Sequence, residues 1–315
     1  MCTAINETRG RHIFGRTLDL ECSWSERAVI TPRYYELKFL HEPTLTKHFA
    51  LIGIAHVSDG VPLYYDAANE WGLAAAGLNF GKSAKYSASK RCAHNIASFE
   101  LIPWVLGQCK NVREAAILLE NTAICGESFS ADLPATPMHW LFGDATGAIT
   151  AEPLANGLKV YDNPFGTLTN EPGFDYHLTN VKNYAALTPK APHNTLCPEI
   201  DLPPYSRGMG ALGLPGDFSS ASRFVRAVFA KTHTLPEVSE ADAVNRFFHV
   251  MNTVAVPRGC ILTDEGAAVS TLYTSCVDTE SLTYYFSTYD RCEIRSFNLF
   301  DAELDSDAIF CRNNF

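Results

Sequence analysis

The second residue of the chain is a cysteine, and this position would give it two reactive groups if Met1 were removed. Methionine aminopeptidase removes an initiator methionine when the next side chain is small. The mature chain would then begin with Cys2, which would carry both a thiol and a free α-amino group. The ordinary pKa values of these groups, about 8.5 and about 7.7–8.0, are close enough for the amine to accept the thiol proton. A nucleophile served by an N-terminal amine is a known arrangement for covalent acyl transfer.

Two charged residues follow one predicted hairpin downstream, in the stretch Phe14-Gly15-Arg16-Thr17-Leu18-Asp19. If this stretch folds back against Cys2, Arg16 can stabilise a thiolate and Asp19 can accept a hydrogen bond from the α-amino group. The alternative is a surface ion pair on a strand, which contributes little to stability. The local pattern alone leaves both interpretations open.

The elements that would position these residues are mostly short strands. Runs rich in β-branched and aromatic residues occur at 12–18, 27–31, 35–39, 50–56, 61–65, 72–80, 139–142, 148–152, 158–161, 167–169, 272–276 and 282–288. Helical spacing is found within 96–120, with a break near Lys110, and at 176–186, 219–230 and 239–251. Ser219 and Ser239 are the expected N-caps of the last two helices. Because strands and helices do not alternate as βαβ units, the fold class predicted is α+β, with packed sheets covered by helices.

Composition narrows the possible functions. The 315 residues carry 25 Lys and Arg against 35 Asp and Glu, a formal net charge of −10, and 46% of them are hydrophobic. This is the composition of a globular protein with a substantial core, and the length allows one or two domains. An acidic chain without a Lys/Arg run repels phosphate backbones and anionic lipids. We therefore expect a small-molecule substrate, and neither nucleic-acid nor membrane partners.

Ten scattered cysteines form no CxxC pair and no zinc-finger spacing, so we expect no structural metal site. The N-terminus lacks the basic start and apolar stretch of a secretory signal, and the apolar runs are far shorter than the roughly 20 residues of a membrane span. These features predict a cytoplasmic protein with reduced thiols.

Five short motifs in order along the chain resemble the choloylglycine hydrolase family, which comprises bile salt hydrolases and penicillin V acylases. They are Cys2 at the start, Gly15-Arg16-x-Leu18-Asp19, Gly77-Leu78-Asn79-Phe80, Leu168-Thr169-Asn170 with Phe174-Asp175, and Leu214-Pro215-Gly216-Asp217 with Ser222-Arg223-Phe224. Each motif alone is weakly specific, but five in compatible order and spacing are strongly so. The resemblance implies an N-terminal nucleophile hydrolase fold, a four-layered αββα sandwich, in one domain over residues 2–315.

The resemblance also implies the roles of the site residues. The family's core set is complete at Cys2, Arg16, Asp19, Asn79, Asn170 and Arg223. Cys2 would be the nucleophile, the charged residues would support it, and the two asparagines would stabilise the oxyanion and position the amine. The thiolate would attack an amide carbonyl, the α-ammonium would protonate the leaving amine, and water would hydrolyse the thioester. No cofactor is implied, and His139 and His177 are expected to be core or surface residues.

The substrate must be inferred from the pocket, because both branches of the family share this chemistry. Gly77-Leu78-Asn79-Phe80 is similar to bile salt hydrolases, whereas many penicillin V acylases have a bulkier aromatic residue at the Asn79 position. We therefore expect a conjugated bile salt, with penicillin V or a related N-acyl amide as the alternative. Candidates for the apolar wall around a steroid are Leu18, Trp24, Val57, Tyr64 and Tyr65. Because strand neighbours face opposite ways, Tyr64 and Tyr65 should not both line the pocket.

A long segment rich in Pro and Gly, 189–217, is predicted to be an irregular loop of functional importance. Its Ser206-Arg207 pair resembles members that prefer taurine conjugates, since a guanidinium suits a sulfonate, while Gly208-x-Gly210 resembles glycine-preferring members. Alternatively, Arg207 is a solvated loop charge. We predict that taurine conjugates are at least as good as glycine conjugates. Family members are commonly homotetramers assembled partly through a protruding hairpin, and we expect the same here.

Two functions of other kinds remain open from the sequence. A non-catalytic small-molecule binding protein could use the same fold, but the complete set of six site residues would then have no task. A redox or metal protein could use the other nine cysteines.

Overall fold

Two antiparallel β-sheets form the centre of the computed structural model, which describes residues 1–87, 94–237 and 239–312. In the first sheet the strand order is β12-β1-β2-β14-β15-β16, with β13 paired to β14. Its strands are β1 (Cys2–Glu7), β2 (Ile13–Leu20), β12 (Thr167–Leu168), β13 (Ile261–Leu262), β14 (Ala268–Asp278), β15 (Thr283–Thr288) and β16 (Arg291–Asn298).

The second sheet has the order β11-β10-β9-β6-β5-β4-β3-β17. Its strands are β3 (Glu26–Thr31), β4 (Leu51–Ser58), β5 (Val61–Asn69), β6 (Ala74–Asn79), β9 (Met138–Asp144), β10 (Gly147–Leu154), β11 (Gly157–Asp162) and β17 (Phe310–Arg312). A separate parallel pair is formed by β7 (His94–Ala97) and β8 (Thr122–Cys125).

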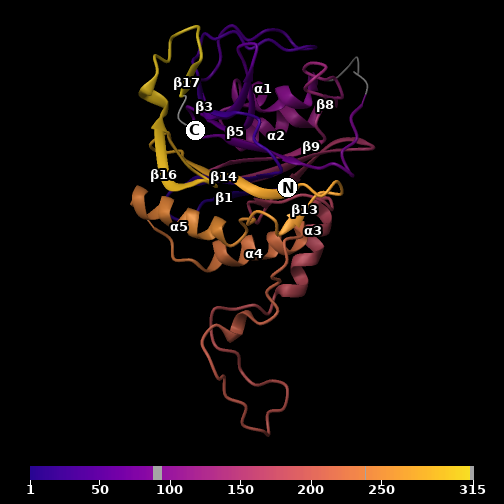
Figure 1. Cartoon of the computed structure of the whole chain (residues 1–315), viewed down its shortest axis with the longest axis vertical. Helices are drawn as coiled ribbons and strands as arrows, with labels where there is room; N and C mark the ends of the chain where they lie inside the picture. The colour runs from indigo at the N-terminus through magenta and orange to yellow at the C-terminus, as the bar shows by residue number, and fades with distance from the viewer. Residues whose placement is uncertain (88–93, 238, 313–315) are drawn as a thin grey trace.

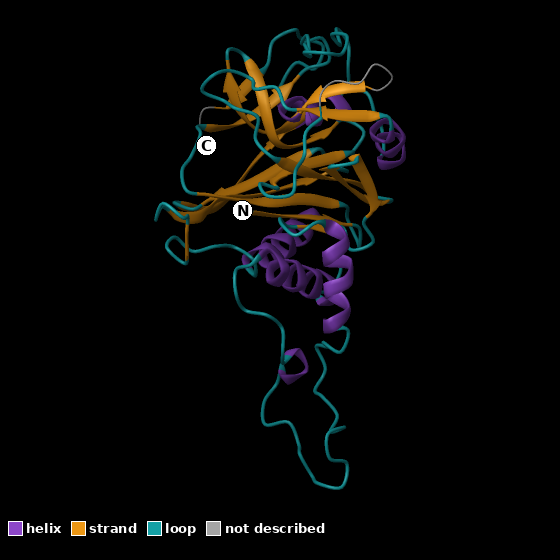
Figure 2. Ribbon diagram, turned by 90° about the vertical axis from the view of Figure 1, so that its right-hand side faces the viewer, coloured by secondary structure: helices purple, strands orange, loops and turns teal. Residues whose placement is uncertain are grey.

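Helices cover the outer faces of both sheets (Figures 1 and 2). On the side of the first sheet lie α3 (Phe174–Asn180), α4 (Ser220–His233) and α5 (Glu240–Asn252), and on the side of the second lie α1 (Leu101–Leu106) and α2 (Val112–Glu120). Short 3₁₀ helices are η1 (Ser98–Glu100), η2 (Val181–Tyr184), η3 (Met209–Ala211) and η4 (Leu299–Asp301). The four layers confirm the predicted αββα sandwich.

The hydrophobic side chains divide among the three interfaces between these layers because successive strand residues face opposite ways. On β1, Ala4 packs between the two sheets, whereas Ile5 faces α4 and α5 and packs near Phe247. On the second sheet, Ile52 enters the inter-sheet core and Leu51 packs on the helix side, near Leu101. The alternation of apolar residues along the strands is thus what builds four layers from one chain.

Most predicted elements are confirmed, with differences at particular places. Ser219 and Ser239 cap α4 and α5 as predicted, each accepting a backbone hydrogen bond from the first turn. The predicted strand at 35–39 is wrong, because that segment makes only the isolated pairing of Leu37 with Leu45 and joins no sheet. No helix in the described part of the chain is long and apolar enough to cross a membrane.

The irregular segment between η2 and α4 projects away from the layered body (Figures 1 and 2). It contains η3 as its regular element, in agreement with the predicted loop over 189–217. Several large apolar side chains on it are exposed, including Leu196 at 90%, Tyr205 at 85% and Leu212 at 66%. We call residues 186–217 the arm.

Candidate active site

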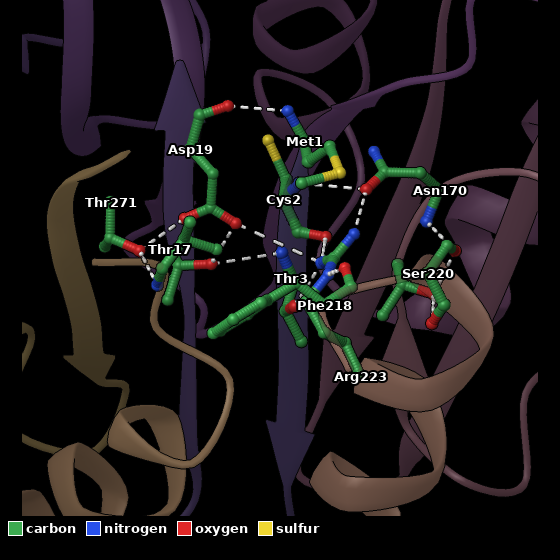
Figure 3. Close-up of polar contacts among 12 residues, drawn as sticks. Met1, Cys2, Thr3, Thr17, Asp19, Asn170, Phe218, Ser220, Arg223 and Thr271 are labelled. Carbon is green, nitrogen blue, oxygen red and sulfur yellow. Dashed lines mark hydrogen bonds and ion pairs between the residues drawn. The ribbon is translucent and has the colours of Figure 1, made fainter. Parts of the chain in front are cut away.

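The fold buries Cys2 at the start of β1, with 2% of the residue exposed. Its Cα is paired with that of Leu18 on β2, and Ala4 is paired with Arg16, so the antiparallel register brings the β2 motif alongside Cys2. Asn170 lies two residues after the end of β12, which pairs with β1 on its other side. Arg223 reaches Cys2 from α4. Four distant parts of the sequence therefore meet around one cysteine (Figure 3).

Met1 is present in this structure, and it binds Asp19 through the backbone. The Met1 α-ammonium donates to the Asp19 carbonyl oxygen at 2.6 Å, and the Asp19 backbone nitrogen donates to the Met1 carbonyl at 3.0 Å. The nitrogen of Cys2 is therefore an amide, and it donates to Oδ1 of Asn170 at 2.9 Å. Met1 thus occupies the end of the site, next to the cysteine.

Asn170 has a defined orientation because its partners distinguish its two side-chain atoms. Oδ1 accepts from Arg223 Nη2 at 2.6 Å as well as from the Cys2 nitrogen. Nδ2 donates to the carbonyl oxygen of Asn79 at 2.7 Å. Since a guanidinium can only donate and a carbonyl can only accept, this assignment of oxygen and nitrogen is the one that satisfies every contact.

Arg223 is fully buried and holds the backbone of the cysteine. Nη1 donates to the Cys2 carbonyl at 2.5 Å and to Thr3 Oγ1 at 2.7 Å, and it lies 4.0 Å from Asp19 Oδ2. Burial lowers the pKa of the Arg223 guanidinium, and the negative charge of Asp19 opposes this effect. The Asp19 carboxylate also accepts from Thr271 Oγ1 at 2.7 Å. Its oxygens are therefore held beside the β1 terminus by neighbouring elements.

Arg16 is a buried cation whose contacts are neutral carbonyl groups. Its Nη1 donates to the carbonyl oxygens of Tyr65 at 3.0 Å and Gly77 at 2.6 Å, while Nε donates to its neighbour Thr17. Nη2 has no hydrogen-bond partner among the described residues.

Among the described residues Arg16 makes no direct ion pair, and its charge is balanced by electrostatic attraction to groups that it does not bond. Burial alone would lower the pKa of its guanidinium, but nearby anionic and titratable groups hold that pKa above its ordinary value. Cys2 is the first of these groups, followed by Tyr273, Asp66 and Asp19. Arg16 therefore has a guanidinium nitrogen without a hydrogen-bond partner and interacts electrostatically with Cys2, so it is suited to stabilise a thiolate there.

Asn79 joins the site through its backbone. Its carbonyl accepts from Asn170, whereas its side-chain Oδ1 accepts from the Gly81 nitrogen at 3.2 Å in the turn that follows β6. All six residues of the predicted catalytic set therefore lie in one connected region, and Asn170 links three of them directly.

Buried polar residues that the sequence did not mark as part of the site hold the segment of Asn170 in place. His139 Nε2 bonds the Thr169 carbonyl at 2.9 Å, and His177 Nε2 bonds the Asn170 carbonyl at 3.0 Å. His139 Nδ1 lies 3.0 Å from Oε1 of Glu152. The available signal in the sequence was a His and a Glu on two adjacent predicted strands.

The predicted pocket residues fall on the first sheet (Leu18), on the two faces of the second sheet (Val57, Tyr64 and Tyr65) and in two loops (Trp24 and Arg207). Leu18 and Tyr65 pack in the inter-sheet core, which also contains Cys2. Val57 and Tyr64 pack on the opposite, helix-covered face, where the Tyr64 hydroxyl bonds Thr31 at 2.7 Å, so the placement of both at the site is corrected. The prediction that Tyr64 and Tyr65 face opposite ways is confirmed.

The other two candidates are exposed. Trp24 lies in the turn after β2 with 47% of its surface accessible. Arg207 is exposed on the arm, which projects away from the sheets, so a contact between Arg207 and the site of the same chain is not supported.

A surface cavity of about 650 Å³ lies at the end of β2. Its lining includes Ser270 and Leu272, which flank the Thr271 that bonds Asp19, and Cys22 from the turn after β2. A second cavity of about 880 Å³ is lined by residues of the loop before β4, of β5 and of α1, and contains none of the six site residues. None of the six site residues lines the smaller cavity either, but the two neighbours of Thr271, which bonds Asp19, do line it.

Comparison with known proteins agrees with this arrangement. The family model described as linear amide C–N hydrolases, choloylglycine hydrolase family, matches residues 2–311. The chain is 45% identical to a bile salt hydrolase/transferase of Lactiplantibacillus plantarum over 97% of this chain and 94% of the relative. It is 36% identical to a conjugated bile acid hydrolase of Lactobacillus acidophilus, over 98% and 99% of the two chains.

Solved structures give the same result. A mutant of the conjugated bile acid hydrolase from Clostridium perfringens superposes with a TM-score of 0.91 at 33% identity, covering 99% of this chain and 96% of that one. Penicillin V acylase from Agrobacterium tumefaciens, at 20% identity, shares the fold with a TM-score of 0.78 over 99% and 90% of the two chains. The chain therefore belongs to the choloylglycine hydrolase family. It is an enzyme that hydrolyses linear amide C–N bonds.

Proposed function

We propose that this enzyme is a bile salt hydrolase, which cleaves the amide bond of glycine- or taurine-conjugated bile acids. The observation that carries the proposal is the convergence of Arg16, Asn170 and Arg223 on Cys2, in a chain 45% identical to a bile salt hydrolase/transferase over nearly its whole length. The single domain over residues 2–315, the removal of Met1 and the cytoplasmic location are part of the same proposal.

In the proposed reaction, removal of Met1 converts the Cys2 nitrogen from an amide into the α-amine. Asn170 Oδ1, which already accepts from this nitrogen at 2.9 Å, orients the amine. The amine takes the thiol proton, and Arg16 stabilises the thiolate. The thiolate sulfur attacks the substrate carbonyl carbon, and the ammonium then gives its proton to the leaving nitrogen of taurine or glycine. Water, deprotonated by the amine, cleaves the thioester and releases the bile acid.

The oxyanion formed on attack needs donors, and the two asparagines supply them in this proposal. Asn170 Nδ2 carries two hydrogens, so it can keep its bond to the Asn79 carbonyl and donate the second to the oxyanion. An N–H group of Asn79, from the backbone or the side chain, is the second donor. In comparable sites such a donor contributes about 3–4 kcal/mol to the transition state.

The substrate is proposed to bind at the 650 Å³ cavity beside the end of β2, whose lining combines apolar residues with charged ones, among them Arg258 and Arg291. Leu272 lines this cavity and also packs against the inter-sheet core that holds Leu18. Trp24 lies in the same turn as Cys22 and Ser23, which line the cavity, so it remains a candidate for the wall. A cavity of this volume is in the range that takes a drug-sized ligand.

Penicillin V, or a related N-acyl amide, is the alternative substrate. The fold is shared with a penicillin V acylase at 20% identity, but the relatives from Lactiplantibacillus plantarum and Lactobacillus acidophilus, at 45% and 36% identity, are bile acid enzymes. A second activity is acyl transfer, in which an amine replaces water in the attack on the thioester. The name of the Lactiplantibacillus plantarum relative, bile salt hydrolase/transferase, favours acyl transfer as a second activity.

We propose that the protein is a homotetramer and that the arm takes part in its assembly. Exposed Leu196, Tyr205 and Leu212 are suited to such a contact. Arg207 could then meet substrate only in the site of a neighbouring copy. The prediction that taurine conjugates are at least as good as glycine conjugates depends on that contact, and a tenfold preference for glycocholate in kcat/KM would contradict it.

The test is a hydrolysis panel of taurocholate, glycocholate and penicillin V on protein whose N-terminal Cys2 is verified by mass spectrometry. We expect rapid hydrolysis of the bile salts and slow hydrolysis of penicillin V. Cys2→Ser should be nearly inactive, whereas Cys292→Ser, at an exposed thiol that does not line the proposed substrate cavity, should keep its activity. If the verified protein hydrolyses penicillin V faster than both bile salts, the bile salt assignment is wrong.

A further inference from the structure

Asn170 lies in a stretch of chain without a sheet to hold it. Strand β12 ends at Leu168, after only two residues. The Asn170 nitrogen donates to Ser220 Oγ at 2.8 Å, but the carbonyl groups of Thr169 and Asn170 must find other donors in a buried setting. Those donors are the imidazoles of His139 and His177.

His139 contacts both of the segments that carry the site asparagines. Its Nε2 lies 2.9 Å from the carbonyl of Thr169, immediately before Asn170. The ring of Phe80, immediately after Asn79, stacks on the imidazole with the centroids 4.3 Å apart and the planes at 8°. His139 and Phe80 are both fully buried. One side chain on β9 thus fixes the ends of two segments that meet at the Asn170–Asn79 hydrogen bond.

Glu152 fixes His139 in turn. It lies on the neighbouring strand β10, fully buried, with Oε1 at 3.0 Å from His139 Nδ1. Its two oxygens also accept from the Phe174 nitrogen, at 3.0 and 3.2 Å, at the start of α3. Glu152 therefore connects the strand pair β9–β10 to the turn that follows Asn170.

Both ring nitrogens of His139 face oxygen atoms. These contacts limit where protons can lie on His139 and Glu152. The Thr169 carbonyl can only accept, so Nε2 must carry a hydrogen. The contact between Nδ1 and Glu152 then requires one more proton, located on the imidazole or on the carboxyl group. In either form the pair is neutral overall, which limits the cost of burying it and adds no net charge near Cys2.

We propose that His139 and Glu152 form a positioning pair that holds Asn170, and through it the Cys2 nitrogen, in the geometry required for catalysis. Neither residue touches the reacting atoms, so both act through Asn170. This inference rests on the proposed function for its kinetic consequence, but its structural consequence can be measured without any substrate.

The chain offers a matched control for His139. His48 is also buried, and its two ring nitrogens lie 2.7 and 2.8 Å from the carbonyls of Phe49 and Tyr35. It contacts none of the six site residues among its hydrogen-bond partners. His48→Gln and His139→Gln each remove one buried imidazole that joins two acceptors, and only the second should affect the site.

Two variants of Glu152, to Gln and to Ala, test whether its hydrogen bonds are what matters. In Glu152→Gln, the amide oxygen can accept from Phe174 and the amide nitrogen can donate to His139 Nδ1, so His139 keeps its bond to Thr169. In Glu152→Ala both contacts are lost. We expect Glu152→Gln to stay within threefold of the original kcat and Glu152→Ala to fall at least tenfold.

The experiment combines steady-state kinetics on taurocholate with hydrogen-exchange mass spectrometry of the processed enzyme. We expect His139→Gln to lower kcat at least tenfold with KM within twofold, and to speed amide exchange in the segment after β12 and at the end of β6. His48→Gln should keep kcat within twofold and leave exchange in those segments unchanged. A folded His139→Gln protein with unchanged kcat and unchanged exchange would overturn the proposal, as would Glu152→Gln falling as far as Glu152→Ala.

The two proposals fail in different ways. If the unsubstituted enzyme hydrolyses no bile salt, the proposed function is wrong, and the exchange comparison of His139→Gln with His48→Gln still decides whether His139 positions Asn170. If the unsubstituted enzyme and His48→Gln are active, the kcat of His139→Gln decides directly whether His139 positions Asn170.

Discussion

The side-chain oxygen of Asn170 accepts a hydrogen bond from the backbone nitrogen of Cys2 at 2.9 Å, although 168 residues separate them along the chain. Arg223 donates to the same oxygen at 2.6 Å and also holds the Cys2 carbonyl. The nitrogen proposed to become the catalytic amine is thus fixed by one neutral acceptor, and that acceptor is fixed by a buried cation.

Replacing Asn170 with Ala should leave this nitrogen without its acceptor. We expect kcat/KM for taurocholate to fall roughly 100-fold, because small displacements of a reacting group have effects of this size. Asn163→Ala is the matched control, since Asn163 is also buried but bonds Thr150 and Thr167 in the turn before β12. It should lower the melting temperature while kcat stays within a few-fold of the original. Equal losses of kcat in the two variants would contradict the role given to Asn170.

Protein that keeps Met1 should be inactive. Its Cys2 nitrogen is an amide, which cannot accept the thiol proton, and Met1 is bonded to Asp19 at the end of the site. In preparations with different degrees of processing, activity should be proportional to the fraction of molecules that intact-mass spectrometry shows to begin at Cys2. Hydrolysis at full rate by unprocessed protein would exclude the amine as the base.

Arg16→Met should slow alkylation of the Cys2 thiol by iodoacetamide about tenfold at pH 7, because the reacting thiolate loses the neighbouring cation that stabilises it. Arg16→Lys should restore part of the rate, since it returns the charge but not the two carbonyl contacts. Arg226→Met is the control: Arg226 is a largely buried arginine on α4 that bonds the carbonyls of Pro215, Asp217 and Thr253. If the Arg16→Met protein were alkylated as fast as the Arg226→Met control, Arg16 would not act on the thiol.

Lys231 should make stability depend on pH in a defined window. Burial lowers the pKa of its ammonium to about 8 from an ordinary value of 10.5. Between these values the unfolded chain binds more protons than the folded one, so the free energy of unfolding contributed by this group rises with pH. Urea unfolding at pH 7.5 and 10 should therefore show that the enzyme gains stability relative to Lys231→Met. If the difference in the free energy of unfolding between the enzyme and Lys231→Met stayed constant or became smaller from pH 7.5 to 10, the lowered pKa of Lys231 would be contradicted.

Substituting Leu196 and Leu212 by Glu should dissociate the proposed tetramer without unfolding the layered body, because both side chains are exposed on the arm. Light scattering on a sizing column would measure the mass, and far-ultraviolet circular dichroism would check the fold. Val61→Glu, a partly exposed apolar residue on β5, is a control that should leave the assembly unchanged. A double variant with unchanged mass would exclude these two residues from the interface.

The layered fold was predictable because apolar alternation marks most strands, and two serines mark the starts of α4 and α5. Strand β1 was harder to predict, because its Thr3 and Asn6 are polar and yet buried. Thr3 bonds Thr17 and Arg223. Asn6 bonds the carbonyls of Asp144 and Gly147, which also lie outside β1 in the sequence. A local pattern cannot show that such groups will be satisfied.

The pocket was only partly predictable for a related reason. Leu63, Tyr64 and Tyr65 are consecutive apolar residues, so their sequence contains no signal for which of them faces the cysteine. The pairing of β4 with β5 decides this, and it includes a register shift between Ile54 and Ala55. The His139–Glu152 pair was missed because a buried His is recognised as a support only when the carbonyl it binds is known.

The two hydrogen bonds between Met1 and Asp19 bear on when the enzyme can mature. An aminopeptidase must bind an extended, free N-terminus, but in the folded chain the Met1 ammonium is bonded and Cys2 is almost completely buried. In the proposed maturation, removal of Met1 and the pairing of β1 with β2 therefore compete on the nascent chain. A chain that folds before Met1 is removed would be trapped as a stable and inactive species, so the yield of active enzyme depends on the ratio of two rates and not only on the stability of the fold.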